Sequence, residues 1–184
     1  ITGSEGLLGV VTEVIVRILR KPETARALMV GFAQVEAAGE CVARIIGAGI
    51  IPGGMEMMDR PAIHAAEAFV NAGYPLDVEA LLIIELDGSS IEVDELIKRV
   101  EAIALGCGST TCRISGSEAE RDLFWAGRKA AFPAVGRISP DYICMDGTIP
   151  RGALPRALAR IRELSEKYGL GVANVFHAGD GNLH

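Results

Sequence analysis

Two of the three histidines in the chain, His177 and His184, bracket the sequence Gly-Asp-Gly-Asn at residues 179–182. This sequence favours a tight turn, because glycine tolerates positive φ and Asp and Asn bond to nearby backbone. Such a turn could bring both imidazoles to one point. Imidazole is a common ligand of divalent metals and a proton shuttle near neutral pH. The spacing therefore predicts a metal or catalytic site, with an ordinary hydrogen-bonded histidine pair as the alternative.

Arg128 lies near the end of a predicted helix and is followed by the apolar stretch 130–134. A guanidinium in this position could hold a carboxylate through two parallel hydrogen bonds, although a solvated helix face is the simpler interpretation. Asp146, which precedes Gly147, could be a ligand, but a turn-forming role is favoured. His64 lies among alanines on another predicted helix, and we assign it no chemistry.

A glycine-rich turn opens the chain at residues 3–9. Its free backbone N–H groups could cradle a phosphate or a dinucleotide. A β-branched segment at residues 10–18 follows and predicts a strand, whereas a dinucleotide-binding fingerprint of the Rossmann type leads into a helix. The residues of this turn that we consider for cofactor binding are Gly3, Ser4, Glu5, Gly6 and Gly9.

The element pattern changes at Lys21 and Pro22, so we predict one unit over residues 1–21 and a second over 22–184. Asp59 is placed to cap a helix, and Ser117 with Glu120 forms a capping-box pattern. The order β-α-β-β-α-β occurs twice, imperfectly. It predicts an α+β fold with a ferredoxin-like antiparallel sheet and helices on one face. The predicted strands are 27–32, 55–57, 80–87, 110–114, 142–149 and 172–176, and the predicted helices are 34–48, 61–71, 91–105, 117–131 and 151–168.

The composition excludes several classes of protein. A 184-residue chain that is 49% hydrophobic is globular rather than disordered. The net charge of −6 and the 5% aromatic content argue against a nucleic-acid partner. No apolar run approaches the length of a transmembrane helix. The four cysteines show no C-x-x-C spacing and predict reduced, buried thiols in a cytoplasmic protein.

Four blocks, in this order, resemble the FAD-linked oxidases of the vanillyl-alcohol-oxidase type: residues 3–13, 124–133, 142–150 and 177–184. The similarity is strongest to the branch that oxidises small 2-hydroxy acids. It implies that residues 1–21 end the FAD-binding domain and that residues 22–184 form the substrate-binding cap domain. Since the chain begins without Met, and nothing after His184 supplies a third metal ligand, we expect a fragment that is inactive by itself.

The resemblance also implies roles for individual residues. His177 and His184 would bind a divalent ion, completed by a glutamate beyond residue 184, with the histidine beside that glutamate as base. Arg128 would hold the substrate carboxylate. A lysine that assists this arginine in hydroxyglutarate enzymes falls at Cys144, which favours glycolate or D-lactate as the substrate. The expected reaction gives the 2-oxo acid and passes hydride to FAD.

A second hypothesis treats the chain as a ferredoxin-like binding or dimerisation module whose histidines are structural. In the enzymatic hypothesis the expected partners are a small 2-hydroxy acid and either other oxidase subunits or a second copy of the chain. Such subunits would place the cytoplasmic protein at the periphery of a membrane.

Overall fold

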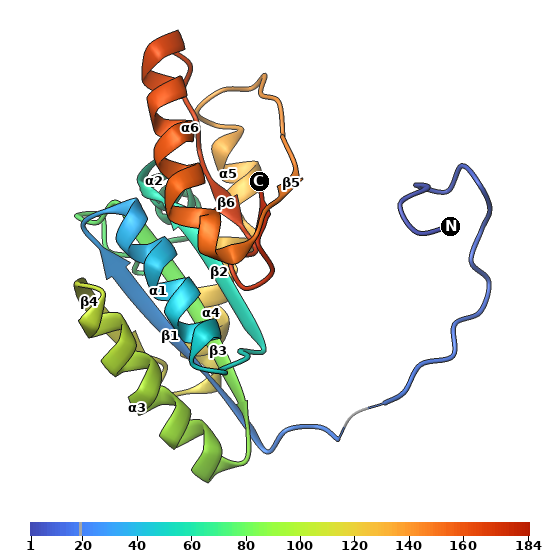
Figure 1. Cartoon of the computed structure of the whole chain (residues 1–184), viewed down its shortest axis with the longest axis vertical. Helices are drawn as coiled ribbons and strands as arrows, with labels where there is room; N and C mark the ends of the chain where they lie inside the picture. The colour runs from blue at the N-terminus through green and yellow to red at the C-terminus, as the bar shows by residue number, and fades with distance from the viewer. Residues whose placement is uncertain (19) are drawn as a thin grey trace.

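The computed structural model describes residues 1–18 and 20–184 (Figure 1). A five-stranded antiparallel sheet has the order β4-β1-β3-β2-β6. Strands β1 and β3 pair along their whole length, from Thr24 opposite Gly88 to Phe32 opposite Ala80. The strands are β1 (Thr24–Phe32), β2 (Gly54–Asp59), β3 (Ala80–Gly88), β4 (Ser109–Ile114) and β6 (Val175–Phe176).

The first four strands form a ferredoxin-like core. Helix α1 (Val35–Gly47) connects β1 to β2, and α3 (Ser90–Gly106) connects β3 to β4. Each connection skips one position in the sheet, so β3 lies between β1 and β2 while β1 lies between β3 and β4. The predicted α+β class and the antiparallel sheet are confirmed.

Helices cover both faces of this sheet, which differs from the expected single helical face. One core contains side chains from α1, α3 and α6 (Leu154–Tyr168). The other contains side chains from α2 (Arg60–Val70), α4 (Glu118–Lys129) and α5 (Ala131–Val135). Along β1, Leu28 and Val30 enter the first core and Ala27 and Met29 the second. Strands buried on both faces are apolar throughout, so their sequence does not reveal which face a helix covers.

The second β-α-β-β-α-β unit does not form. Of the predicted strand 142–149 only β5 (Gly147–Thr148) is present, and it pairs with β7 (Asn182–Leu183). Of the predicted strand 172–176 only β6 is present, at the sheet edge beside β2. Ile143 and Met145 are exposed, and none of the described strands lies beside them to complete a ladder. A short 3-10 turn, η1 (Arg151–Ala153), leads into α6, which packs against α1.

Residues 1–18 and 20–23 form an arm that runs away from the domain (Figure 1). The glycine-rich turn is present, because Ser4 N–H donates to Ile1 O and Leu7 N–H to Ser4 O. The predicted strand 10–18 does not form, and its large apolar side chains are exposed. A strand needs a neighbour to accept its backbone hydrogen bonds, and none of the described strands pairs with residues 10–18.

The predicted helix caps are present. Asp59 accepts a hydrogen bond from Ala62 N at 3.3 Å, and Ser117 accepts one from Glu120 N at 3.2 Å. The Glu120 carboxylate bonds to Gly116 N instead of closing a full capping box. Within the described ranges, no helix combines the length and the apolar character that crossing a membrane requires.

Candidate active site

His177 and His184 lie next to each other. Their ring centroids are 5.2 Å apart and the rings are nearly perpendicular, at 84°. The turn closes through the bridge between His177 and Asn182 and through the bond from Asp180 N to His177 O. Gly181 has a φ of +77°, and a side chain there would collide with the Ile149 carbonyl. The predicted tight turn is therefore confirmed, and it brings the two imidazoles together.

Strand β2 places a carboxylate that the sequence analysis missed beside these histidines. Glu56 Oε1 lies 2.7 Å from His177 Nδ1. Its other oxygen, Oε2, accepts from Arg128 Nε at 3.0 Å and lies 2.9 Å from Arg128 Nη2. The Glu56 side chain is only 12% exposed. A single acidic residue between Met55 and Met57 in a buried strand was the available sequence signal.

Arg128 is buried, with 9% of its side chain exposed, which excludes the solvated helix face for this residue. The next residue, Lys129, is exposed and takes the solvent side of α4. Arg128 uses Nε and Nη2 for Glu56, and Nη1 makes no hydrogen bond to the described residues. The guanidinium thus keeps part of its donor fork for another acceptor.

His184 also faces a carboxylate, since its Nδ1 lies 3.4 Å from Asp146 Oδ1. Asn182 Nδ2 donates to the same oxygen at 2.7 Å, so Asp146 anchors the turn. Each histidine therefore has Nδ1 beside a carboxylate, an arrangement typical of histidines that bind a metal through Nε2. The described residues contain no group of three or more His, Cys, Asp or Glu arranged to hold a metal ion.

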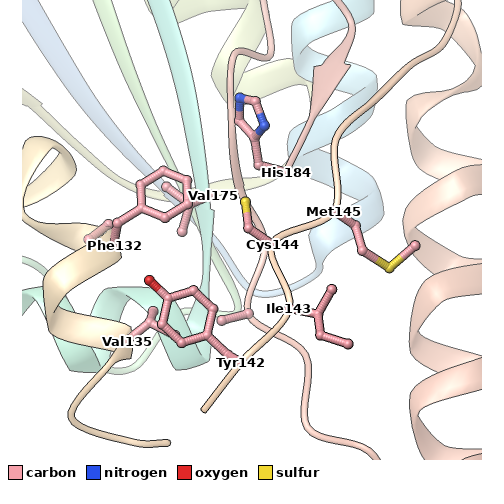
Figure 2. A pocket seen from close by; sticks show the side chains of 10 residues that line it. Phe132, Val135, Tyr142, Ile143, Cys144, Met145, Val175 and His184 are labelled. Carbon is pink, nitrogen blue, oxygen red and sulfur yellow. The ribbon is translucent and has the colours of Figure 1, made fainter. Parts of the chain in front are cut away.

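A small pocket of about 60 Å³ opens beside His184 (Figure 2). Figure 2 shows His184 and Cys144 on adjoining segments, with Phe132 and Tyr142 across from them. The ring centroids of Phe132 and His184 are 6.2 Å apart. The pocket is mostly apolar and has no lysine or arginine in its lining, which consists of Ala131, Phe132, Val135, Tyr142, Ile143, Cys144, Met145, Ala173, Val175 and His184.

Asp59, at the end of β2, anchors the segment that carries His177. Its Oδ2 accepts from Asn174 N at 2.9 Å and from Asn174 Nδ2 at 2.7 Å, and Asp59 N donates to Asn174 O at 3.0 Å. Burial raises the pKa of the Asp59 carboxyl to about 6, against the lowering effect of these hydrogen bonds. The folded state therefore favours the protonated carboxyl relative to the unfolded chain.

We expect the Asp59→Asn variant to change how stability depends on pH. The folded pKa of about 6 exceeds the ordinary value of 3.8, so the Asp59 contribution to stability is complete below pH 3.8. It is then lost as the pH rises through 6. The free energy of unfolding of the variant should therefore rise relative to wild type by about 2 kcal/mol between pH 4 and 7. Urea unfolding at several pH values measures this difference, and a difference that stays constant contradicts the prediction.

The remaining predicted residues lie elsewhere. Gly3, Ser4, Glu5, Gly6 and Gly9 are in the N-terminal arm, which Figure 1 shows running away from the domain, and their role with FAD stays a prediction.

His64 lies on α2 and bonds to Leu76 O, outside the site. The four cysteines are free thiols, but the prediction that all are buried is wrong, because Cys112 and Cys144 are exposed. Burial raises the pKa of the Cys41 thiol above its ordinary value.

Residues 21–184 match the profile of the family described as "FAD linked oxidases, C-terminal domain". This match covers most of the chain, and the chain belongs to this family.

Among curated proteins, the chain is similar to glycolate oxidase subunit GlcD of Escherichia coli K12, with 62% identity over all of this chain and 37% of that protein. GlcD of Bacillus subtilis is 35% identical over 99% of this chain and 39% of the relative. A D-lactate dehydrogenase of Anaerostipes hadrus is 26% identical over 99% of this chain and 40% of its own length. The chain thus spans well under half the length of these relatives.

Two solved structures share the fold. An alkyldihydroxyacetonephosphate synthase superposes with a TM-score of 0.66 and 16% identity, over 98% of this chain and 39% of the other. A 4-ethylphenol oxidase from Gulosibacter chungangensis gives a TM-score of 0.62 and 12% identity, over 90% of this chain and 39% of the other. At these identities the likeness concerns the fold alone.

Proposed function

We propose that this chain forms the substrate-side domain of a FAD-dependent oxidoreductase that converts a small 2-hydroxy acid to its 2-oxo acid. The observation that carries this proposal is the meeting of Arg128 and His177 at Glu56, with His184 beside His177 and lining an apolar pocket. The 62% identity to a glycolate oxidase subunit supports the same reaction class.

The proposed division of the chain follows the same reasoning. Residues 22–184 would be the substrate-binding cap domain, and residues 1–21 the end of the FAD-binding domain. Two observations support it. The family match begins at residue 21, and the arm contributes no strand to the sheet of the domain in its described residues. The glycine-rich turn 3–9 would then contact FAD through its backbone N–H groups.

In this proposal Arg128 binds the substrate carboxylate through the donors that Glu56 leaves free. His177 and His184 hold a divalent ion or the α-hydroxyl of the substrate through Nε2, since a carboxylate lies at each Nδ1. Two imidazoles suit a divalent ion, and a complete site needs a further ligand. Bound FAD supplies the hydride acceptor. The apolar side chains around His184 exclude water from the reacting carbon.

The pocket supports a small substrate. Its volume is about 60 Å³ and its lining carries no lysine or arginine, so a second carboxylate would have no cationic partner there. Cys144 is part of this lining, at the position where the resemblance implies a lysine in hydroxyglutarate enzymes. We therefore propose glycolate or D-lactate as the substrate.

Partners and location belong to the same proposal. The GlcD relatives are named as subunits, which supports association with other oxidase subunits, and a homodimer is the alternative. The four free thiols support a cytoplasmic location, at the periphery of a membrane if partner subunits bind there. The family match and the identity to a glycolate oxidase subunit favour the enzymatic hypothesis over a plain binding or dimerisation module.

The test is the visible spectrum of the full-length protein that contains this sequence. Under anaerobic conditions, glycolate or D-lactate should bleach its flavin bands, while a dicarboxylic 2-hydroxy acid should leave them nearly unchanged. The 184-residue chain alone should purify without flavin absorbance. A full-length protein whose flavin no 2-hydroxy acid reduces, or a flavin that stays with the 184-residue chain through gel filtration, would contradict the proposal.

A further inference from the structure

We infer that Glu56 is a positioning residue that sets Arg128 and His177 relative to each other. The expected effect of Glu56 on kcat and KM rests on the proposed function, whereas its contacts with Arg128 and His177 do not. One carboxylate serves two partners with separate oxygens. Oε1 meets His177 Nδ1 at 2.7 Å, and Oε2 meets both Nε and Nη2 of Arg128 at 3.0 and 2.9 Å.

The backbone of β2 fixes Glu56 against the histidine turn. Met57 pairs with Phe176, directly before His177, and Gly179 N donates to Met55 O at 3.1 Å. These backbone contacts flank Glu56 on both sides, so β2 and the turn keep one register. His177 is therefore held beside Glu56 by the sheet edge as well as by the side-chain contact.

The α4 face of the sheet fixes the other partner. Glu56 shares its face of β2 with Met58, which belongs to the core covered by α2 and α4. Arg128 reaches this face from the last turn of α4, and Phe124, one turn earlier, is fully buried in the same core. Because Arg128 and Glu56 are almost completely buried, each charge depends on the other for compensation. A shift of Glu56 would therefore move or release the guanidinium.

Glu85 on the neighbouring strand provides a matched control. It lies opposite Gly54 in the β2–β3 register and accepts a hydrogen bond from Trp125 Nε1 at 2.7 Å. Like Glu56, Glu85 is a strand carboxylate that bonds to a side chain of α4. No hydrogen bond or ion pair connects it to His177 or Arg128 among the described residues. If the Glu56 variant loses activity only because α4 is held less firmly, Glu85→Gln should therefore lose activity as well.

The kinetic test compares Glu56→Gln, Glu56→Asp and Glu85→Gln in the full-length protein, with glycolate and D-lactate. For Glu56→Gln we expect kcat/KM to fall about 10–100-fold, the range typical when the partner that orients a metal-binding histidine is lost. KM should rise because Arg128 is no longer held in position to bind the substrate carboxylate, and kcat should fall because His177 is no longer oriented toward the α-hydroxyl or its metal ion. Glu56→Asp keeps the charge, so it should recover part of the thermal midpoint. It should not recover the rates, because its carboxylate is retracted by roughly 1.5 Å. Glu85→Gln should stay within about twofold of wild type.

A second measurement is independent of substrate. Double-mutant cycles of unfolding should show coupling between Glu56→Gln and Arg128→Gln, and between Glu56→Gln and His177→Gln. The cycle of Glu85→Gln with Arg128→Gln should be additive. If wild type oxidises no 2-hydroxy acid, the proposed function fails while these cycles still decide the inference. The inference itself is overturned if both Glu56 cycles are additive, or if Glu56→Gln and Glu85→Gln change kcat and KM alike.

Discussion

Replacement of His177 or His184 by alanine should remove bound divalent metal and turnover together in the full-length protein. The two ring centroids lie 5.2 Å apart, and each ring has Nδ1 beside a carboxylate. Each variant therefore removes one of two adjacent imidazole ligands proposed for the metal. A metal that polarises the α-hydroxyl contributes several kcal/mol to the transition state, which corresponds to a loss of about a thousandfold or more in kcat. Elemental analysis of the purified protein and steady-state rates measure the two effects.

His64→Ala is the matched control for this experiment. His64, the third histidine of the chain, lies on α2 and bonds to Leu76 O, away from the turn. This variant should keep both the metal content and the rate. If His177→Ala and His184→Ala also keep a normal metal content and a normal rate, the histidines are structural, and the binding-module hypothesis gains.

Replacement of Arg128 by alanine should affect both catalysis and stability. Loss of the contact with the substrate carboxylate should remove about 2–4 kcal/mol of transition-state stabilisation, seen as a lower kcat/KM that comes mostly from a higher KM. Because Glu56 would keep a buried and uncompensated charge, the free energy of unfolding should also fall by about 3–5 kcal/mol. Kinetics with glycolate and chemical unfolding measure the two losses separately.

Two further variants separate these effects. Arg128→Lys keeps the charge but loses the planar fork, so most of the stability should return while kcat/KM stays low. Lys129→Ala changes the exposed neighbour on α4 and should leave both quantities unchanged. An Arg128→Ala protein with a normal kcat/KM would show that Arg128 does not contact the substrate.

Local sequence signals predicted most of the elements of this domain. Asp59 and Ser117 begin helices as their cap positions indicate, because capping depends on residues only three positions apart. Hydrophobic spacing also located the strands that pair inside the sheet. The segments 10–18 and 142–149 were predicted as strands and are mostly irregular, since a β-branched or alternating sequence forms a strand only where a neighbouring edge accepts it.

The turn that joins His177 to His184 follows from local sequence alone, because glycine and short polar residues specify its backbone within a few positions. The surroundings of this turn, in contrast, depend on how distant segments pack together. Glu56 meets Arg128 and His177 across separations of 72 and 121 residues. Such a contact depends on strand order, on β6 joining the sheet beside β2, and on α4 covering the second face. The spacing of residues along the chain does not specify these long-range contacts. The position of the Glu56 carboxylate between Arg128 and His177 could therefore not be predicted from the sequence.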